Sequence, residues 1–484
     1  MTRNVALVVL DTVRKDSFDE HAPRLRGMAD TSFEQCRAAS SWSLPSHTSM
    51  FTGTLPSEHG IHAEAFDASF DFGDVDREDT FLGRLPDHRT VGLSANSYIN
   101  TAFGFDAWFD DWGDYSIGSH TGESLFTEGI SVNQFMKESD EPNALRRYRD
   151  FLRTCLSHEH PAKSAANGVW TLVGDHVKRL PVPEFVDDGA SNITKRAVEQ
   201  ADEPGPFFLF ANYMDAHTPL RNLVQHDTSM HDVPNSWSSK EIDKWELNVD
   251  GAATEEYTQN YRDVYAAAID YLDRTLARGI QKLQATADRE TTVVVVSDHG
   301  HSLGYEADGH LFHHTGSMTE GIVHTPCEII NPPEGWPERV DEYLSHLSLG
   351  DLVVALANEE PFDESLTDER VVSETIGLLG GENATWDRDF SDEELAHWNR
   401  MMRVAYEGET KYQWNSLGDR VEYELDHGRP GWQAERATGV EIPDWARAAF
   451  ETPLDEYKRE AAATTQDDDF DPEVEQQLKE LGYL

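Results

Sequence analysis

The sequence predicts an α/β fold in which helices cover both faces of a large, mostly parallel sheet. Two continuous apolar runs, residues 5–10 and 291–296, each lead directly into polar residues. A strand that is apolar at every position is buried on both faces, as in parallel sheets that lie between helices. Long amphipathic patterns separate these runs, and this alternation of strands and helices is typical of the α/β class.

The other elements fit the same plan. Residues 90–95 and 207–213 form further apolar, strand-like runs. Residues 255–283 carry apolar side chains at helical spacing and predict a long amphipathic helix. In open α/β sheets, ligands bind beyond the carboxyl ends of the strands, so functional side chains are expected there.

Changes in composition and in hydrophobic periodicity divide the chain into three regions. Residues 1–358 are predicted to form the catalytic α/β domain, and residues 110–188, aromatic and acidic without a clear period, are expected to form an excursion or lid. Residues 359–484 are predicted to form a C-terminal subdomain. It contains a small antiparallel element, a β-hairpin of residues 404–414 and 421–425, and ends in a helix at residues 474–481 after an acidic linker.

The charge is strongly acidic. Ninety acidic residues against forty basic ones give a formal net charge of -50, spread along the whole chain. This balance argues against nucleic acid or an anionic membrane surface as a partner. It indicates adaptation to high salt, where a short Debye length screens repulsion between carboxylates, so a halophilic protein is expected.

Three cysteines, Cys36, Cys155 and Cys327, form neither a disulfide framework nor a zinc-binding spacing. The first predicted strand begins within five residues of Met1, which leaves no room for a signal peptide. No apolar run is long enough to cross a bilayer. We therefore expect a protein of the cytoplasm without a membrane span.

Side chains that can bind a metal follow two distant strands. Asp11 comes directly after the first strand, and Asp298 and His299 follow residues 291–296. An unpaired charge beside a core is costly, so carboxylates delivered to the same sheet edge predict a cation site. Asp11 alone is also compatible with a helix cap, but together with Asp298 and His299 it favours a metal.

A candidate nucleophile lies between these strands. Ser43 precedes Pro45 and a run of small residues that predicts a helix with Ser43 at its N-terminus. Amide groups and the helix dipole at such an end favour an anionic substrate group. A divalent cation held by Asp11, Asp298 and His299 would activate the hydroxyl, which is otherwise a poor nucleophile.

These residues together resemble the sulfatase family of the alkaline phosphatase superfamily. The resemblance follows the family's order along nearly the whole chain. It implies an alkaline phosphatase-like fold and, together with the charge, a haloarchaeal type of sulfatase with serine at the formylglycine position. The matching segments are Asp11, residues 43–46 with 52–53, residues 104–106, 212–219, 297–300, 314–317 with Glu320 and Pro326, and residues 478–484.

The resemblance implies a ligand set and a cofactor. It makes Asp11, Ser43, Asp298 and His299 the residues that hold one divalent ion, with Ser43 as the catalytic nucleophile. Calcium is the family's common metal, and oxygen-rich coordination also suits magnesium or manganese, while the histidine leaves zinc open.

Three departures from the family's pattern bear on the chemistry. Ser43 stands where the family has a cysteine that becomes formylglycine, His47 stands for an arginine, and Asn96 lies near the position of a lysine. Without the arginine, conversion of Ser43 to formylglycine is disfavoured. An unmodified serine suits phosphate, phosphonate or phosphodiester chemistry at least as well as sulfate hydrolysis.

Histidines are expected to replace the missing cations. The resemblance assigns His217 to the transferred group and His314 to the leaving side, with His47 and Asn96 as further substrate-binding residues. His47, His217 and His314 are predicted to be catalytic, and His217 or His314 could act as general acid because imidazole titrates near neutrality. His301, His310 and His313 are expected to be solvated.

The leading hypothesis is a metal-dependent hydrolase of sulfate or phosphate esters of a sugar or glycan. A second hypothesis is a phosphoryl-group transferase, in which the intermediate on Ser43 passes to an alcohol. A third is a catalytically silent protein that binds an anionic saccharide. Fold alone does not separate the three.

Overall fold

The computed structural model describes residues 2–63, 70–116, 144–177, 182–314, 316–378 and 388–464, together with 129, 130, 132, 135, 136 and 139. The predicted terminal helix at residues 474–481 and the acidic linker at 467–471 lie outside the described residues.

A mixed sheet of nine strands forms the centre of the structure, in the order β11-β2-β10-β6-β1-β5-β3-β4, with β9 paired to β2. The four predicted strands are confirmed: they are β1, β3, β5 and β6, all mutually parallel. The strands are β1 (Asn4–Leu10), β2 (Thr31–Arg37), β3 (Arg89–Ser94), β4 (Asp111–Asp114), β5 (Phe207–Tyr213), β6 (Thr291–Val296), β9 (His324–Thr325), β10 (Cys327–Ile330) and β11 (Arg339–Ser345).

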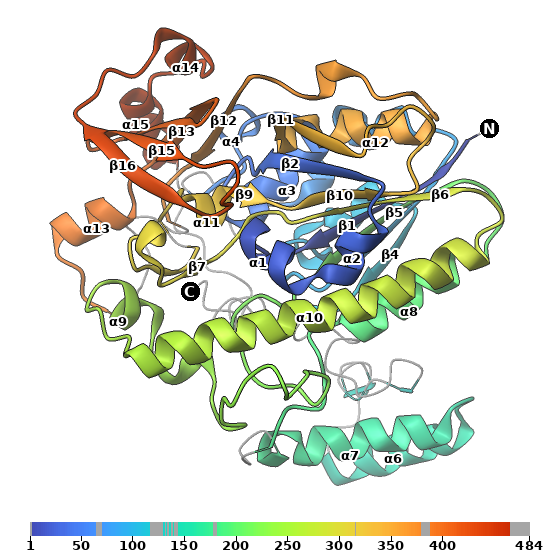
Figure 1. Cartoon of the computed structure of the whole chain (residues 1–484). Helices are drawn as coiled ribbons and strands as arrows, with labels where there is room; N and C mark the ends of the chain where they lie inside the picture. The colour runs from blue at the N-terminus through green and yellow to red at the C-terminus, as the bar shows by residue number, and fades with distance from the viewer. Residues whose placement is uncertain are drawn as a thin grey trace.

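Helices cover both faces of this sheet, as the apolar strands predicted. Alternate residues of β1 serve two separate cores: Ala6 and Val8 pack under one helical layer, and Val5 and Leu7 under the other. Figure 1 shows α10 below the sheet and α12 above it. The first layer contains α1 (Lys15–His21), α2 (Pro23–Met28), α8 (Ala190–Gln200) and α10 (Glu255–Thr286); the second contains α3 (Ser43–Thr52) and α12 (Leu349–Ala357).

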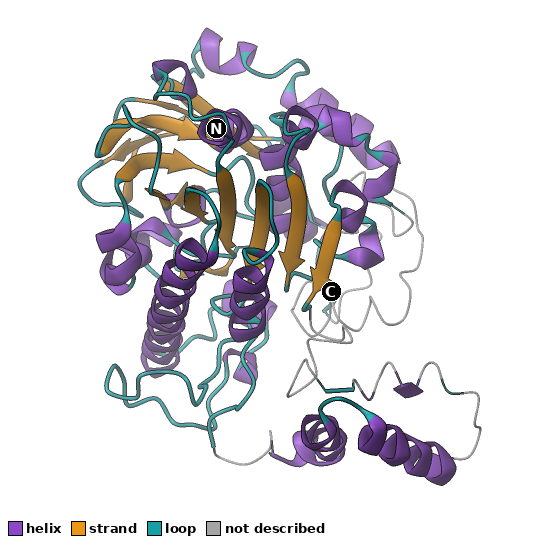
Figure 2. Cartoon of the chain, turned by 90° about the vertical axis from the view of Figure 1, so that its right-hand side faces the viewer, coloured by secondary structure: helices purple, strands orange, loops and turns teal. Residues whose placement is uncertain are grey.

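The region expected as an excursion divides into two parts. β4 pairs in parallel with β3 and extends the sheet, although its sequence has no apolar run, because an edge strand needs burial on fewer sides. Helices α6 (Ala144–Ser157) and α7 (Pro161–Val177) form a pair that stands away from the main body (Figure 2).

The C-terminal region is larger than the predicted hairpin. It forms a five-stranded antiparallel sheet in the order β12-β13-β14-β15-β16. Residues 404–414, expected as a single strand, turn at Gly408 with φ of 54° and so form parts of two strands. The elements are β12 (Arg370–Thr375), β13 (Met402–Glu407), β14 (Thr410–Asn415), β15 (Arg420–Leu425), β16 (Gln433–Thr438), α13 (Asp392–Trp398), α14 (Asp444–Ala448) and α15 (Leu454–Thr464).

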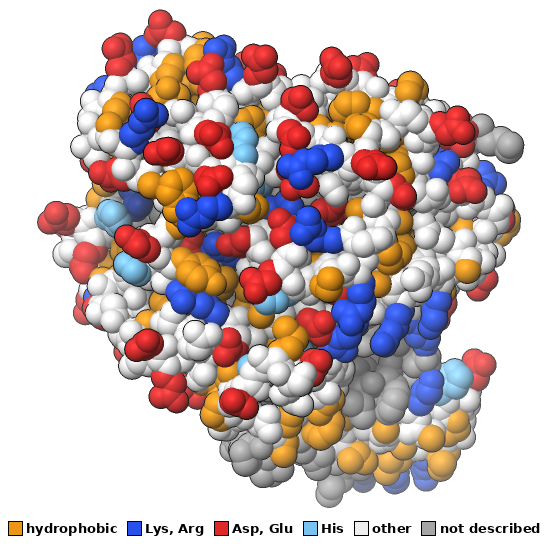
Figure 3. Space-filling view, viewed as in Figure 1, with side chains coloured by type: hydrophobic (Ala, Val, Ile, Leu, Met, Phe, Trp, Pro, Cys, Tyr) orange, Lys and Arg blue, Asp and Glu red, His pale blue; other side chains and the backbone are white. Residues whose placement is uncertain are grey.

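Short elements connect the two sheets and surround the strand ends. They are α4 (Pro56–His59), α9 (Lys244–Asn248), β7 (Ser302–Leu303), β8 (Phe312–His313) and α11 (Glu320–Val323). Acidic side chains are spread over the whole face seen in Figure 3, with Lys and Arg between them. Within the described part of the chain, no helix combines the length and apolarity needed to span a bilayer.

A buried ionic cluster joins the C-terminal sheet to the main body. Glu320 accepts from Lys411 of β14 at 3.2 Å and lies 3.0 Å from Arg37 of β2. All three side chains are at most 2% exposed. Burial lowers the pKa of Lys411 to about 8, although Glu320 opposes this shift. The carboxylate of Glu320 therefore compensates two buried cations from two different sheets.

Removing this carboxylate is expected to destabilise the fold strongly. Glu320→Gln leaves Arg37 and Lys411 without their shared carboxylate, which costs about 3–5 kcal/mol of the free energy of unfolding. The exposed pair of Glu407 and Arg370 provides the control, since Glu407→Gln should cost less than about 1 kcal/mol. Urea unfolding at fixed salt measures both, and equal losses would contradict the prediction.

Candidate active site

The carboxyl ends of β1 and β6 bring three candidate ligands together. Asp11 follows β1, and Asp298 and His299 follow β6, its parallel neighbour in the sheet. One ligand atom of each residue lies within 4.8 Å of the other two, and all three side chains are fully buried. The pairing of β1 with β6 thus brings together residues that are nearly three hundred positions apart in the sequence.

Each of the two carboxylates leaves one oxygen without a protein partner. Oδ1 of Asp298 accepts from the backbone N–H groups of Thr12 at 3.1 Å and His299 at 2.8 Å, whereas its Oδ2 accepts from no described residue. Oδ2 of Asp11 accepts from Asn96 and Ser43, whereas its buried Oδ1 likewise has no partner in the described chain. Two orphaned, buried carboxylate oxygens fit a bound cation.

The ring of His299 completes this donor set. Its Nδ1 lies 2.9 Å from the carbonyl of Gly300, so the ring hydrogen resides on Nδ1 and Nε2 carries the lone pair. Nε2 lies 3.4 Å from Oδ2 of Asp298 and 3.5 Å from Oγ of Ser43. A backbone carbonyl that fixes the tautomer in this way is the usual support of a metal-binding histidine.

The electrostatics of the site favour a positive charge. Burial, with a contribution from the neighbouring Asp298, raises the pKa of Asp11 to about 7 against the opposing effects of His217 and His299. Burial likewise raises the pKa of Asp298 to about 7. The two carboxylates repel each other and are buried from solvent, so a cation between them would restore their ionised forms.

A strained backbone turn at Thr12, directly after Asp11, helps to position the two carboxylates. Thr12, a β-branched residue, has φ of 61°, in the left-handed region that such residues rarely adopt. Its carbonyl accepts from the hydroxyl of Tyr265 at 2.7 Å, and its own hydroxyl donates to the carbonyl of Asp11. The strain is thus held in place by contacts that point the amide of Thr12 at Asp298.

Ser43 begins helix α3, as the sequence predicted. Its hydroxyl donates to Oδ2 of Asp11 at 3.1 Å. Three residues later, Ser46 donates from its hydroxyl to the backbone carbonyl of Asp298 at 2.6 Å, which ties the first turn of α3 to the end of β6. Two contacts therefore fix the position of Ser43: its own hydrogen bond to Asp11, and the hydrogen bond that anchors the first turn of α3.

His47 is occupied on both ring nitrogens. Its Nδ1 donates to the carbonyl of Ser43 at 2.8 Å, and its Nε2 accepts from Nδ2 of Asn212 at 2.7 Å. Burial lowers the pKa of His47 to about 3, so the ring is neutral. The expected contact of His47 with substrate oxygens therefore has no ring N–H available for it, and His47 instead fixes the backbone of Ser43.

Asn96 was expected to bind substrate, but both polar groups of its side chain form hydrogen bonds to the protein. Its Nδ2 donates to Oδ2 of Asp11 at 2.7 Å, and its Oδ1 accepts from the backbone N–H of Tyr98 at 2.8 Å. Asn96 thus holds the carboxylate of Asp11 in place. Sequence reasoning missed Asn212, although its place near the carboxyl end of an apolar strand was a signal that could have identified it.

The remaining histidines gather beside the ligand set. The ring centroid of His314 lies 4.6 Å from that of His299 and 5.6 Å from that of His217. Nδ1 of His217 faces the carbonyl of Thr218 and Nδ1 of His314 faces that of Ser41, so both neutral rings carry their lone pair on Nε2. Burial lowers the pKa of each ring.

The expectation that His301, His310 and His313 are solvated holds only for His310, which is exposed. His313 is partly buried, and His301 is fully buried with its Nε2 at 2.6 Å from the hydroxyl of Tyr261. His301 follows shortly after the buried strand β6, and its side chain is directed into the protein interior. Among the described residues, no second group of three candidate ligands is found.

A mostly parallel α/β sheet with a buried carboxylate pair and a helix-borne hydroxyl at its strand ends belongs to the class of folds that carry enzyme sites there, and its donor set could hold a divalent cation. A comparison with protein families places the chain within that class more narrowly. The family model described as Sulfatase matches residues 3–359. The chain therefore belongs to the sulfatase family, as its sequence resemblance implied.

Individual relatives are distant. An uncharacterized sulfatase of Escherichia coli, YidJ, is 26% identical over 207 residues, and the match spans 39% of this chain and 40% of that protein. A phosphonate monoester hydrolase from Silicibacter pomeroyi has a TM-score of 0.55 at 16% identity and covers 89% of this chain and 90% of its own. A 2-O GAG sulfatase has a TM-score of 0.54 at 12% identity, covering 98% and 96%. These structures share the fold, which confirms the predicted architecture.

The raised pKa values predict how the metal-free protein responds to pH. Folded Asp11 binds its proton up to about pH 7, whereas in the unfolded chain its pKa is 3.8. The associated stability is present at low pH and is lost as pH rises through 7. Asp11→Asn should therefore raise the free energy of unfolding at pH 8, without metal, by on the order of 2 kcal/mol, and much less at pH 5.

Chemical denaturation in the presence of a chelator measures this difference. Exposed Asp202, at the turn after α8, supplies the control, since Asp202→Asn should leave the pH dependence unchanged. Adding a divalent cation should reverse the order and make the wild type the more stable protein. A less stable Asp11→Asn protein at pH 8 under metal-free conditions would count against a strained carboxylate pair.

Proposed function

We propose that the protein is a metal-dependent hydrolase of phosphate or phosphonate esters that uses unmodified Ser43 as its nucleophile. The supporting observation is the placement of the Ser43 hydroxyl, 3.1 Å from Asp11 and beside two orphaned carboxylate oxygens. Sulfate esters, the substrates implied by the family, would require formylglycine at this position. Serine with His47 four residues later disfavours that modification.

Asp11, Asp298, His299 and Ser43 would hold one divalent cation. When bound, such an ion supplies positive charge that stabilises the Ser43 alkoxide and the anionic ester. The donor set of two carboxylates, one imidazole and one hydroxyl suits calcium, magnesium, manganese or zinc, with calcium the family's common choice.

The proposed reaction runs in two halves. In the first, Oγ of Ser43 attacks phosphorus, its proton passes to Oδ2 of Asp11, and the bond to the leaving oxygen breaks. The leaving alkoxide takes a proton from water. The position of Ser43 at the start of α3 places backbone N–H groups and the positive end of the helix dipole near the anionic group.

In the second half, water attacks the phosphoserine and Ser43 regains its hydrogen from Asp11. Nε2 of His314 takes the proton of the attacking water, because a neutral ring with its hydrogen on Nδ1 can accept there. The ring then gives this proton to solvent, where it neutralises the hydroxide formed when water protonated the leaving alkoxide. The lowered pKa of His314 keeps the ring neutral at neutral pH, which favours this role of general base over the expected role of general acid. His217 contributes a second neutral ring beside the transferred group.

The organic part of the substrate is proposed to be a sugar or glycan. Sulfatase-fold structures have been solved with k-i-k-neocarrahexaose and with D-glucosamine-2-N,6-O-disulfate. Structural neighbours also include phosphonate monoester hydrolases from two bacteria. Hydrolysis is favoured over transfer to an alcohol because water needs no binding site of its own.

The state of Ser43 decides between phosphorus and sulfur chemistry. Intact mass of the purified protein should equal the mass of the unmodified sequence, whereas formylglycine would remove two hydrogens. With chromogenic phosphate, phosphonate and sulfate esters in molar salt, the phosphorus esters should be hydrolysed with a divalent metal. Ser43→Ala should reduce kcat by about 10³-fold or more. A converted Ser43 with preferred sulfate turnover would contradict the proposal.

His47 and His314 should respond differently to substitution. His47→Gln should lower kcat by about 10- to 100-fold through misplacement of Ser43, without moving the pH profile, because its pKa of about 3 lies outside the working range. His314→Gln should lower kcat more, by about 10²- to 10⁴-fold, because the ring that accepts the proton of the attacking water is removed. Exposed His310→Gln is the control, and a pH profile that moves with His47→Gln would argue against this division.

A further inference from the structure

His346 is a fully buried histidine beside the helix that carries Ser43. It begins the short helix η8 (His346–Ser348), which follows β11. This short helix packs against α3, because a Cβ at Gly53, the residue that ends α3, would lie 3.2 Å from the carbonyl oxygen of Leu347. A polar ring buried at such a place needs partners for its nitrogens.

Both ring nitrogens of His346 lie within hydrogen-bonding distance of hydroxyl groups. Nδ1 is 3.5 Å from Oγ of Ser46, and Nε2 is 3.1 Å from Oγ1 of Thr325. The hydroxyl of Ser46 already donates its hydrogen to the backbone carbonyl of Asp298 at 2.6 Å. Because a hydroxyl has a single hydrogen, the contact between Ser46 and His346 requires a ring hydrogen on Nδ1. His346 therefore donates to Ser46, and Ser46 donates to Asp298.

These contacts join three elements that are far apart in the sequence. Thr325 lies in β9, which pairs with β2, Ser46 lies in the first turn of α3, and Asp298 follows β6. A serine hydroxyl rotates freely unless a donor and an acceptor both fix it. The N–H of His346 supplies the donor, so the hydroxyl of Ser46 stays directed at the carbonyl of Asp298.

The hydrogen bond between Ser46 and Asp298 sets α3 against the ligand set. Ser43, three residues before Ser46, donates to Asp11 at 3.1 Å, and its Oγ lies 3.5 Å from Nε2 of His299. A displacement of about 1 Å at a reacting group can cost about 10²-fold in rate. The group that orients Ser46 therefore acts on the position of Ser43.

We propose that His346 is a positioning residue for Ser43 and that it acts through Ser46. The inference rests on the proposed function, in which Ser43 is the nucleophile. The two ring nitrogens have different roles: the N–H at Nδ1 aligns α3 with Asp298, and Nε2 anchors the ring on Thr325. His346 itself is outside the ligand set.

Two substitutions separate these roles. The amide of asparagine can take the place of Nδ1 and donate to Ser46, whereas the longer glutamine side chain places its amide near Nε2, toward Thr325. With a chromogenic phosphate ester and a divalent metal, His346→Asn should keep kcat within about threefold of the wild type. His346→Gln should lower kcat by about 10- to 100-fold without changing KM. Equal losses of kcat in the two variants would overturn the proposal.

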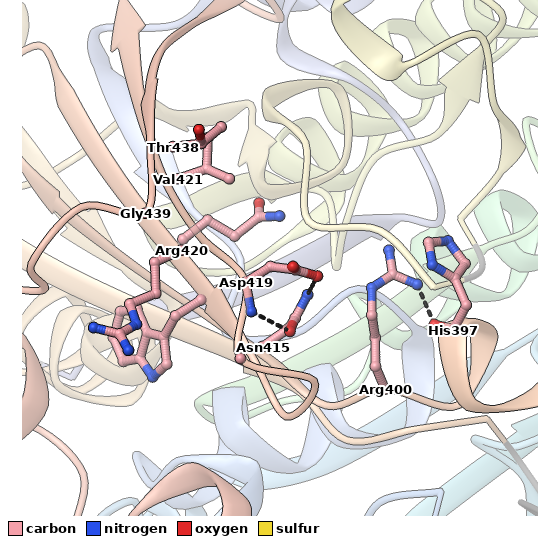
Figure 4. Close-up of a pocket in the computed structure, with 11 residues that line it drawn as sticks. His397, Arg400, Asn415, Asp419, Arg420, Val421, Thr438 and Gly439 are labelled. Carbon is pink, nitrogen blue, oxygen red and sulfur yellow. Dashed lines mark hydrogen bonds between the residues drawn. The ribbon is translucent and has the colours of Figure 1, made fainter. Parts of the chain in front are cut away.

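Two other histidines supply controls. His88 is buried, and its Nε2 lies 2.9 Å from the carbonyl of Arg3, at the amino ends of the strands. His397 lines a pocket of about 380 Å³ on the C-terminal sheet (Figure 4). Within the described chain, no hydrogen bond joins either ring to α3. His88→Gln and His397→Gln should keep the kcat of the wild type, and a loss in His88→Gln as large as that in His346→Gln would contradict the proposal.

A double-mutant cycle with Ser46→Ala tests whether His346 acts through Ser46. Because the hydroxyl that His346 orients is absent in this background, His346→Gln should lower kcat there by less than about twofold. Thermal unfolding verifies that each variant is folded. Losses that add in full would show that His346 acts by another route and would overturn the proposal.

Hydrogen–deuterium exchange of α3, followed by mass spectrometry, tests the same role without turnover. Peptides from residues 43–52 should exchange about threefold faster or more in His346→Gln and in Ser46→Ala than in the wild type, while His346→Asn should match the wild type. If the wild type hydrolyses no ester, the proposed function fails and exchange alone decides. Equal exchange in the wild type and His346→Gln would then overturn the role of His346.

Discussion

The repulsion between two buried carboxylates organises the site on which the function depends. Asp11 and Asp298 reach the same sheet edge from adjacent parallel strands, and neither is compensated by a lysine or arginine of the described chain. Protein interiors hold such pairs only when a proton or a cation neutralises them. Hydrogen bonds hold this pair in place: Asn96 donates to Asp11, and Thr12 and Ser46 donate to Asp298. The polar contacts of the site therefore preserve a strained arrangement that a bound cation would relieve.

Neutral side chains contact Ser43 and Asp11. His47 is locked between Ser43 and Asn212 and adds no charge, while Asn96 supports Asp11 from the other side. The transferred group would then be held by the cation, by the start of α3 and by neutral imidazoles.

Periodicity and strand-end residues were enough to predict much of this arrangement. The runs that became β1, β5 and β6 are apolar at most positions, and their parallel pairing follows from burial on both faces. Convergence of Asp11, Asp298 and His299 follows from the same rule. By contrast, the edge strand β4 contains a single large apolar residue, Trp112, and so has no apolar run. The turn at Gly408 was not visible within a longer alternating run. The partners of His47 were not predictable, because side-chain hydrogen bonds depend on three-dimensional packing that no local pattern encodes.

A crystal structure with manganese, solved with anomalous scattering at the manganese edge, tests the central claim most directly. The account predicts one strong anomalous peak within bonding reach of Oδ1 of Asp11, Oδ2 of Asp298, Nε2 of His299 and Oγ of Ser43, and its loss in Asp298→Asn. Manganese bound elsewhere, or no peak between the two carboxylates at saturating metal and pH 8, would contradict it.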